Sequence, residues 1–152
     1  MWLVLFTLDH VATSQIIWAA GASTLASSSY IVFCAPKSVV AKPQKVIGAY
    51  IIAMFCGEAM RFFANLVCQG ISSCHAGGLV YLHVFEVAAA FSVGIAFLLM
   101  VLLKSEHPPA AGLAVVMVLD IRNFGALAVI LGGAIVLSVI RFIFRRMLCD
   151  LI

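Results

Sequence analysis

Ionisable and amide side chains recur at helical spacing inside a long apolar stretch of this chain. The stretch contains Glu58, Arg61, Asn65 and Gln69, and at 100° per residue all four lie in one narrow stripe. A charge in apolar surroundings is costly, so the stripe is expected to face protein or water. Two interpretations follow: an ion pair between Glu58 and Arg61 that only holds the structure together, or a functional site.

The next apolar stretch adds His83 and Glu86 on one helical face. If the two stretches form an antiparallel hairpin, Glu86 reaches the depth of Arg61. The sequence therefore predicts a cluster of Glu58, Arg61 and Glu86 with His83 beside it. One arginine between two carboxylates favours a raised carboxylate pKa, which suits a proton relay. A static ion-pair network is the alternative.

Two proline-containing loops, residues 35–50 and 106–115, suggest a binding site for a small anion. Proline is favoured in the first turn of a helix, so Pro108 and Pro109 are expected to open a short helix whose free N–H groups point into the loop. An anion can dock there, with charge or donors from nearby side chains, and its affinity would rise as His107 becomes protonated. The predicted substrate-binding residues are His107, Pro108, Pro109, Ala110, Ala111, Gly112, Lys42, Lys45 and Gly48. A proline-capped turn needed only for folding is the alternative.

The composition excludes a soluble globular protein. Of 152 residues, 65% are hydrophobic and 10% are charged, and the mean hydropathy is +1.21. Apolar runs of about 20 residues match a hydrocarbon core roughly 30 Å thick. We expect an all-α membrane protein with one domain over residues 1–152, and four spans near 11–34, 46–68, 79–103 and 124–144. Residues 109–119 are too short to cross and are predicted to form a half-helix or re-entrant helix.

Basic residues indicate how the chain is threaded. The loops after the first and third spans carry lysine or arginine (Lys37, Lys42, Lys45, Lys104 and Arg122), so both are expected to be cytoplasmic. Four crossings would then place Arg141, Arg145 and Arg146 on the opposite side. A fifth crossing by residues 109–119 would remove this conflict, but the segment is short.

Several classes of site are not indicated. Phosphate-binding loops, an activated serine and zinc-ligand spacing are absent from the sequence, so no enzyme, metal, cofactor or nucleic-acid partner is predicted. Five cysteines occur, at positions 34, 56, 68, 74 and 149. A disulfide between Cys68 and Cys74 is possible in an oxidising compartment, but buried inert thiols are favoured.

The two proline loops resemble the motifs of the HPP family of integral membrane proteins. One motif is His107-Pro108-Pro109 followed by small residues. The other runs from Pro36 through Pro43 to Ile47-Gly48, although this chain has Lys42-Pro43-Gln44-Lys45 where the family usually has Gln-Pro-Arg-Asn. The resemblance covers nearly the whole chain. It implies a four-helix membrane domain, and plant and cyanobacterial members are associated with nitrite transport.

These observations favour a transporter or channel for a small inorganic anion, nitrite first, with coupled protons carried by Glu58, Glu86 and His83. The alternative is a membrane subunit that anchors or assembles a larger complex and transports nothing. The expected surroundings are the lipid bilayer and the inner membrane of a prokaryote. Four helices make a thin bundle, so a homo-oligomer is expected, and small residues at a spacing of four favour close helix packing. These pairs are Ala53 and Gly57, Ala90 and Gly94, and Ala128 and Gly132.

Overall fold

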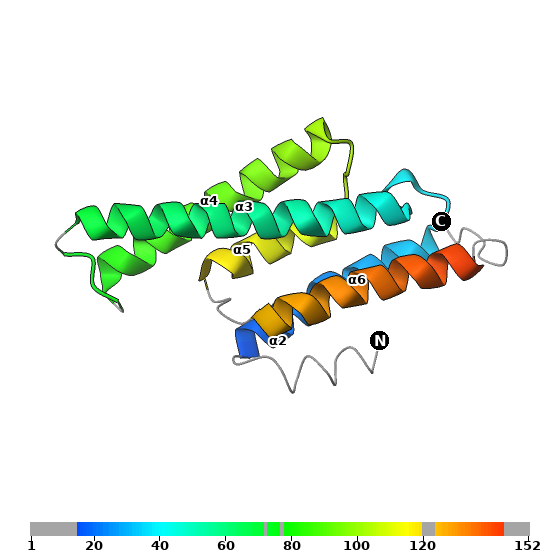
Figure 1. The fold of residues 1–152 in the computed structure, drawn as a ribbon, viewed down its shortest axis with the longest axis horizontal. Helices are drawn as coiled ribbons and strands as arrows, with labels where there is room; N and C mark the ends of the chain where they lie inside the picture. Colours follow the sequence, from blue (N-terminus) through cyan, green and yellow to red (C-terminus); the bar gives the residue numbers. More distant parts are fainter. Residues whose placement is uncertain (1–14, 72, 77, 120–123, 145–152) are drawn as a thin grey trace.

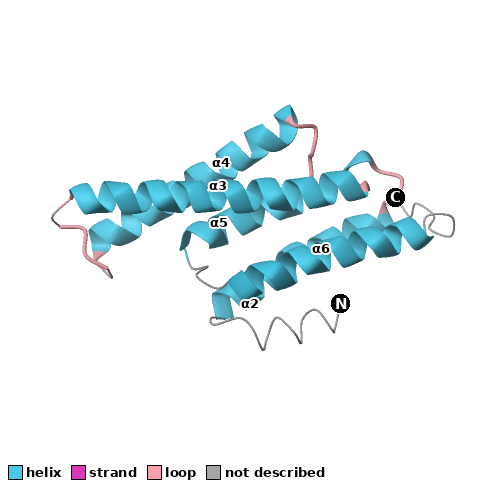
Figure 2. Ribbon diagram, viewed as in Figure 1, coloured by secondary structure: helices cyan, strands magenta, loops and turns pink. Residues whose placement is uncertain are grey.

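The described part of the chain is entirely helical apart from its connecting loops, which confirms the expected all-α class for those residues (Figures 1 and 2). The computed structural model describes residues 15–71, 73–76, 78–119 and 124–144. In chain order the elements are α2 (Gln15–Cys34), the 3-10 turn η1 (Val39–Ala41), α3 (Pro43–Gly70), α4 (Leu79–Leu102), the 3-10 turn η2 (Pro108–Ala110), α5 (Ala111–Leu119) and α6 (Phe124–Phe144).

Three of these helices are long and apolar enough to cross a membrane: α3, α4 and residues 125–144 of α6. The expected spans at 46–68, 79–103 and 124–144 agree with them. The remaining expected span, the first along the chain at 11–34, begins outside the described residues. Helix α2 covers its remainder with 20 residues, but the count of four spans is not confirmed.

The predicted break before the His-Pro-Pro motif is present. Helix α4 ends with Lys104 in the left-handed region, at φ 53°. The N–H of Ser105 bonds to the Met100 carbonyl and that of Lys104 to the Val101 carbonyl, the pairing of a Schellman motif. The chain then turns into η2 and α5, close to the predicted 109–119. Residues 120–123, between the predicted short helix and the last predicted span, lie outside the described residues.

Helix α5 lies inside the bundle. It packs against α3, α4 and α2, and six of its nine residues are buried: Ala111, Leu113, Ala114, Val116, Met117 and Val118. Gly57 of α3 allows the close approach, because a Cβ there would lie 2.3 Å from the Met117 Cβ and 2.7 Å from the Ala114 carbonyl. The other two glycines predicted to pack, Gly94 and Gly132, have nothing within 4 Å of the equivalent position.

The predicted side of the membrane was wrong for the end of the last span. Helix α5 runs back from the His-Pro-Pro loop, so α6 lies parallel to α2 and ends beside the loop that follows α2 (Figure 1). Arg141 fixes this placement, since its Nε and Nη2 both donate to the Pro36 carbonyl, with 3.2 Å between Nε and the oxygen. The short helix α5 thus reverses the direction of the chain as a fifth crossing would. Arg141 therefore lies on the same side as the loop after α2, and not on the opposite side as four crossings would require.

Five of the six lysines and arginines in the described residues therefore gather at one end of the molecule: Lys37, Lys42, Lys45, Lys104 and Arg141. We call this the basic end. The opposite end is the tip of the α3–α4 hairpin. Arg122, Arg145 and Arg146 lie outside the described residues.

Candidate functional site

His107 is the centre of a buried polar chain. Its side chain is fully buried, its Nε2 lies 2.8 Å from the Ser28 hydroxyl, and its Nδ1 lies 2.9 Å from the Val40 carbonyl. The Ser28 hydroxyl lies 2.9 Å from that of Tyr50, and both side chains are fully buried. One connected set of bonds thus joins α2, α3, the loop before α3 and the His-Pro-Pro turn.

The direction of every bond in this chain follows from the Val40 carbonyl. A carbonyl only accepts, so Nδ1 must carry a hydrogen. In the neutral imidazole Nε2 is then an acceptor, and Ser28 must donate to it. The Ser28 oxygen in turn accepts from the Tyr50 hydroxyl. The neutral site therefore reads Tyr50 to Ser28 to His107 to Val40, with each group donating to the next.

Burial lowers the pKa of the His107 imidazole, which lies in the loop outside the spanning helices, below its ordinary value. The bond to the Val40 carbonyl favours the protonated form and opposes part of that shift. His107 is therefore neutral at pH 7, and any rise in anion affinity through its protonation would begin at a lower pH than an ordinary histidine gives.

The two proline loops converge, as the predicted substrate site requires. Val40 and His107 are bonded across them, and a Cβ on Gly48 would lie 2.8 Å from the Ser105 hydroxyl oxygen. Around this junction, Ala110 and Ala111 are buried, Lys45, Gly48 and Pro109 are half-buried, and Lys42, Pro108 and Gly112 are exposed.

Two of the donors expected at the start of the short helix are already used. The Ala110 N–H donates to the His107 carbonyl and the Ala111 N–H to the Pro108 carbonyl. His107 is also bonded through both ring nitrogens. In this conformation these groups hold the turn together, so an anion would reach them only after the turn opens.

One hydroxyl at the junction is unpaired. Ser38, which precedes η1, has a buried Oγ without a hydrogen-bond partner among the described residues. A buried polar atom of this kind is uncommon in native proteins. It gives the loop a donor for a water molecule or an anion.

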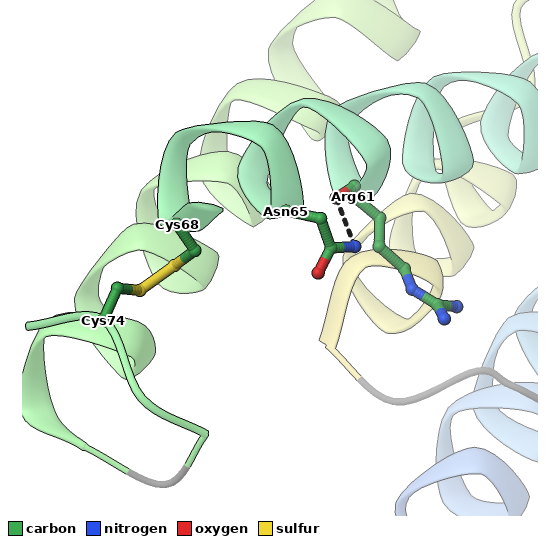
Figure 3. The surroundings of a disulfide bond; sticks show 4 residues. All are labelled: Arg61, Asn65, Cys68 and Cys74. Atoms are coloured by element: carbon green, nitrogen blue, oxygen red, sulfur yellow. Dashed lines mark hydrogen bonds between the residues drawn. A yellow bond between two sulfur atoms is a disulfide. The ribbon is translucent and has the colours of Figure 1, made fainter. Parts of the chain in front are cut away.

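The polar stripe of α3 contains the predicted pair of Glu58 and Arg61, but Glu86 pairs with His83 and not with Arg61. Arg61 Nη1 lies 3.7 Å from Glu58 Oε2, whereas Glu86 Oε2 lies 3.2 Å from Nδ1 of His83. Each pair joins residues three apart on its own helix, and the second is exposed. The Asn65 side chain donates to the Arg61 carbonyl of the same helix at 3.0 Å (Figure 3).

The surroundings of His83 are apolar. A groove of about 380 Å³ between α3 and α4 is lined by His83 and by Met60, Phe63, Ala64, Val67, Val84, Val87, Ala88 and Phe91. Such a groove offers no stabilisation to a small anion. His83 thus lines an apolar groove, whereas His107 lies at a junction of buried polar groups.

The expectation of inert thiols is wrong for one pair. Cys68 and Cys74 form a disulfide across the hairpin tip, with their Cα atoms 5.2 Å apart (Figure 3). Cys34 and Cys56 are free, and Cys149 lies outside the described residues. Within the described ranges no group of three or more metal-ligating side chains occurs.

Sequence reasoning missed Ser28 and Tyr50. The only available signal was that a serine within an apolar helix and a tyrosine in the first turns of the next need polar partners when buried. Nothing in the spacing identified His107, which is 79 residues from Ser28, as that partner.

The geometry thus centres on the His-Pro-Pro turn, and a family described by that motif matches the chain. The family described as "HPP, transmembrane region" matches residues 1–150. The chain belongs to the HPP family. It is therefore an integral, multi-pass membrane protein in contact with the lipid bilayer.

A curated relative of this HPP protein is a transmembrane protein of Dictyostelium discoideum, 30% identical over 120 residues. The match covers 75% of this chain and 37% of the relative, so the chain spans little more than a third of that protein. No solved structure matches the chain.

Proposed function

We propose that this HPP protein transports a small inorganic anion, nitrite first, and that a proton accompanies it. The observation that carries the proposal is the buried chain from Tyr50 through Ser28 and His107 to Val40. Burying four polar groups is costly where apolar residues would pack equally well. Their convergence on one junction between two loops supports a polar site that opens and closes.

Charge supports an anion as the substrate. The junction lies at the basic end, where Lys42 and Lys45 flank the start of α3. Clustered positive charge raises the local concentration of anions. The proposed binding residues are His107 with Pro108, Pro109, Ala110, Ala111 and Gly112, and Lys42, Lys45 and Gly48 across the junction, with the unpaired Ser38 hydroxyl as an added donor.

This conformation represents the closed state of the proposed site. His107 is fully buried, and the donors of Ala110 and Ala111 are bonded within the turn. Anion entry therefore requires the loop before α3 to separate from the His-Pro-Pro turn. The bond between Val40 and His107 is the one that this separation breaks.

Two signals support one orientation. Basic loops are retained in the cytoplasm, and disulfides persist in oxidising compartments. We propose that the basic end is cytoplasmic and the tip with Cys68 and Cys74 lies outside, in the inner membrane of a prokaryote. The positive charge of the basic end would then attract anions on the cytoplasmic side of the membrane.

A membrane subunit that transports nothing is the second candidate. Its helices would present wide apolar faces, and Phe55 is 71% and Phe62 65% exposed on such faces here. A homo-oligomer would cover such faces, and so would lipid. The faces therefore support the subunit and the transporter equally, whereas the buried polar chain supports the transporter.

Flux through purified protein separates the two. Proteoliposomes should accumulate nitrite faster than protein-free liposomes, with nitrate, formate and chloride measured alongside, and an acid-outside pH gradient should increase the rate. His107→Ala should lose this uptake while His75→Ala, which changes an exposed loop histidine, retains it. Uptake equal to that of protein-free liposomes for all four anions would refute transport and leave the membrane subunit.

A further inference from the structure

The coupled proton has to bind somewhere, and the structure offers a group other than the predicted carboxylates. Resting on the transport function above, we propose that His107 binds the coupled proton at Nε2 and that one anion binds with it, so that the pair carries no net charge. The partner of the site is thus an anion together with a proton, and not the anion alone.

Nε2 is the one position on the ring that can accept the proton. Nδ1 already carries a hydrogen, because it donates to the Val40 carbonyl at 2.9 Å. Nε2 accepts from Ser28 at 2.8 Å. Once Nε2 is protonated it becomes a donor, and the Ser28 oxygen must accept from it.

Ser28 can make this reversal without losing a bond. Its oxygen has two lone pairs, one for Tyr50 and one for the protonated His107. Its own hydrogen then needs an acceptor, and a helical serine commonly finds one in the carbonyl four residues earlier. Ser27 and Ser138 already make that bond in this protein, to Ser23 and Ala134 at 2.9 and 2.8 Å.

The charge is what the site cannot neutralise by itself. The described groups that bond His107 are a serine hydroxyl from α2 and a carbonyl from the loop before α3, and Tyr50 of α3 lies beyond the serine. Helix α5 contributes no titratable side chain among its described residues.

Titratable groups farther out do not supply the missing negative charge either. Glu106, next to His107, is exposed to solvent. Lys42, Lys45, Lys104 and Arg141 of the basic end are cationic residues and offer no counter-charge to an imidazolium. A buried imidazolium without a counter-charge is costly, and a bound anion removes that cost.

Binding of the proton and of the anion must therefore be mutually favourable, because each raises the affinity for the other by the same factor. Above the pKa of His107, one coupled proton makes the apparent Kd for the anion rise about tenfold per pH unit. Glu58 pairs with Arg61, and Glu86 with His83, each on its own helix, and the proposal gives these residues no part.

The test uses the full chain with ¹⁵N-labelled histidine in lipid nanodiscs. The signal of His107, one of four histidines, is assigned by its loss in His107→Asn. At neutral pH the spectrum should show the tautomer with hydrogen on Nδ1. Sodium nitrite should raise the apparent pKa of His107. Above that pKa, the Kd for nitrite should increase about tenfold for each unit by which the pH rises. His75→Asn should behave as the unchanged protein does.

Flux in proteoliposomes provides the second readout. Nitrite uptake should be insensitive to an imposed membrane potential and stimulated by a pH gradient, and His107→Asn should abolish that stimulation. Glu86→Gln should keep it. A Ser28→Ala protein should retain nitrite binding and the hydrogen on Nδ1, because the Val40 carbonyl fixes the tautomer and Ser28 only positions the ring.

The outcomes separate this inference from the transport function. A nitrite-dependent shift of the His107 titration without any flux would uphold coupled binding and refute transport. Flux without the shift, flux that depends on membrane potential, or a pH response lost in Glu86→Gln and kept in His107→Asn would overturn the inference. The absence of a shift with nitrite, nitrate, formate and chloride would overturn it as well.

Discussion

Removing the Ser28 hydroxyl should destabilise the protein more than removing the Tyr50 hydroxyl, although the two groups bond to each other. In Ser28→Ala, Nε2 of His107 loses its partner and the Tyr50 hydroxyl keeps only the neighbouring Thr24 side chain, and both groups are fully buried. An orphaned buried polar group costs about 1–3 kcal/mol, which the unpaired Nε2 alone should supply. In Tyr50→Phe, Ser28 still donates to His107, and the loss is only about 1 kcal/mol.

The direction of the hydrogen bonds from Tyr50 through Ser28 to His107 also predicts the stability of the double variant. Adding Tyr50→Phe to Ser28→Ala removes a buried hydroxyl that has already lost its bond to Ser28. The second substitution should therefore be neutral or stabilising in that background, with a coupling energy of about 1–3 kcal/mol. Unfolding in mixed micelles measures all four proteins of the cycle.

Ser27→Ala is the matched control, because that serine is exposed and bonds only to its own helix. It should change stability by less than about 0.5 kcal/mol. Equal losses in Ser28→Ala and Tyr50→Phe that add in the double variant would refute the proposed direction of the bonds.

Three further predictions concern packing, the end of α4 and the disulfide. Gly57→Ala should destabilise the protein by about 1–3 kcal/mol, since the added Cβ would lie 2.3 Å from that of Met117. Gly132→Ala is the control and should be neutral, because its added Cβ would meet nothing within 4 Å. Thermal melting of both variants in nanodiscs measures the difference, and equal losses of stability would contradict the prediction. Lys104→Gly should stabilise by roughly 0.5–1 kcal/mol, because glycine adopts the left-handed φ of 53° freely; a lower midpoint in micelle unfolding would argue against strain at this residue. An impermeant maleimide should label Cys68 and Cys74 from the outside of intact cells only after reduction; labelling without reductant would mean that the pair is not bonded, and labelling from the cytoplasmic side alone would reverse the orientation.

Sequence reasoning succeeded where the physics is local. Proline in the first turn of a helix fixed the position of α5, because the ring cannot occupy a helix interior. The long apolar runs gave the membrane class and three spans for the same reason, since hydropathy and length are properties of contiguous residues.

It brought the two proline loops together, but it failed to identify which distant side chains meet. Serine is common in apolar helices, so Ser28 carried no sign that its hydroxyl bonds a histidine 79 residues away. The predicted joining of Arg61 and Glu86 assumed that residues at equal depth also face each other. In the structure each pairs along its own helix, because a partner three residues away needs no particular rotation between helices. The roles of these residues and of the substrate site stay predictions.

The burial of α5 has a consequence for the biogenesis of the protein. A segment of nine residues cannot be recognised during synthesis as a membrane span, because insertion requires about 20 apolar residues. It can take its place only after α3 and α4 have been inserted, since they form most of its surroundings. Helix α6 is then the last to be oriented, and its direction depends on whether α5 has docked. The bond from Arg141 to Pro36 thus closes the assembly, and a chain in which α5 fails to dock should leave the end of α6 on the wrong side of the bilayer, where quality control can recognise it.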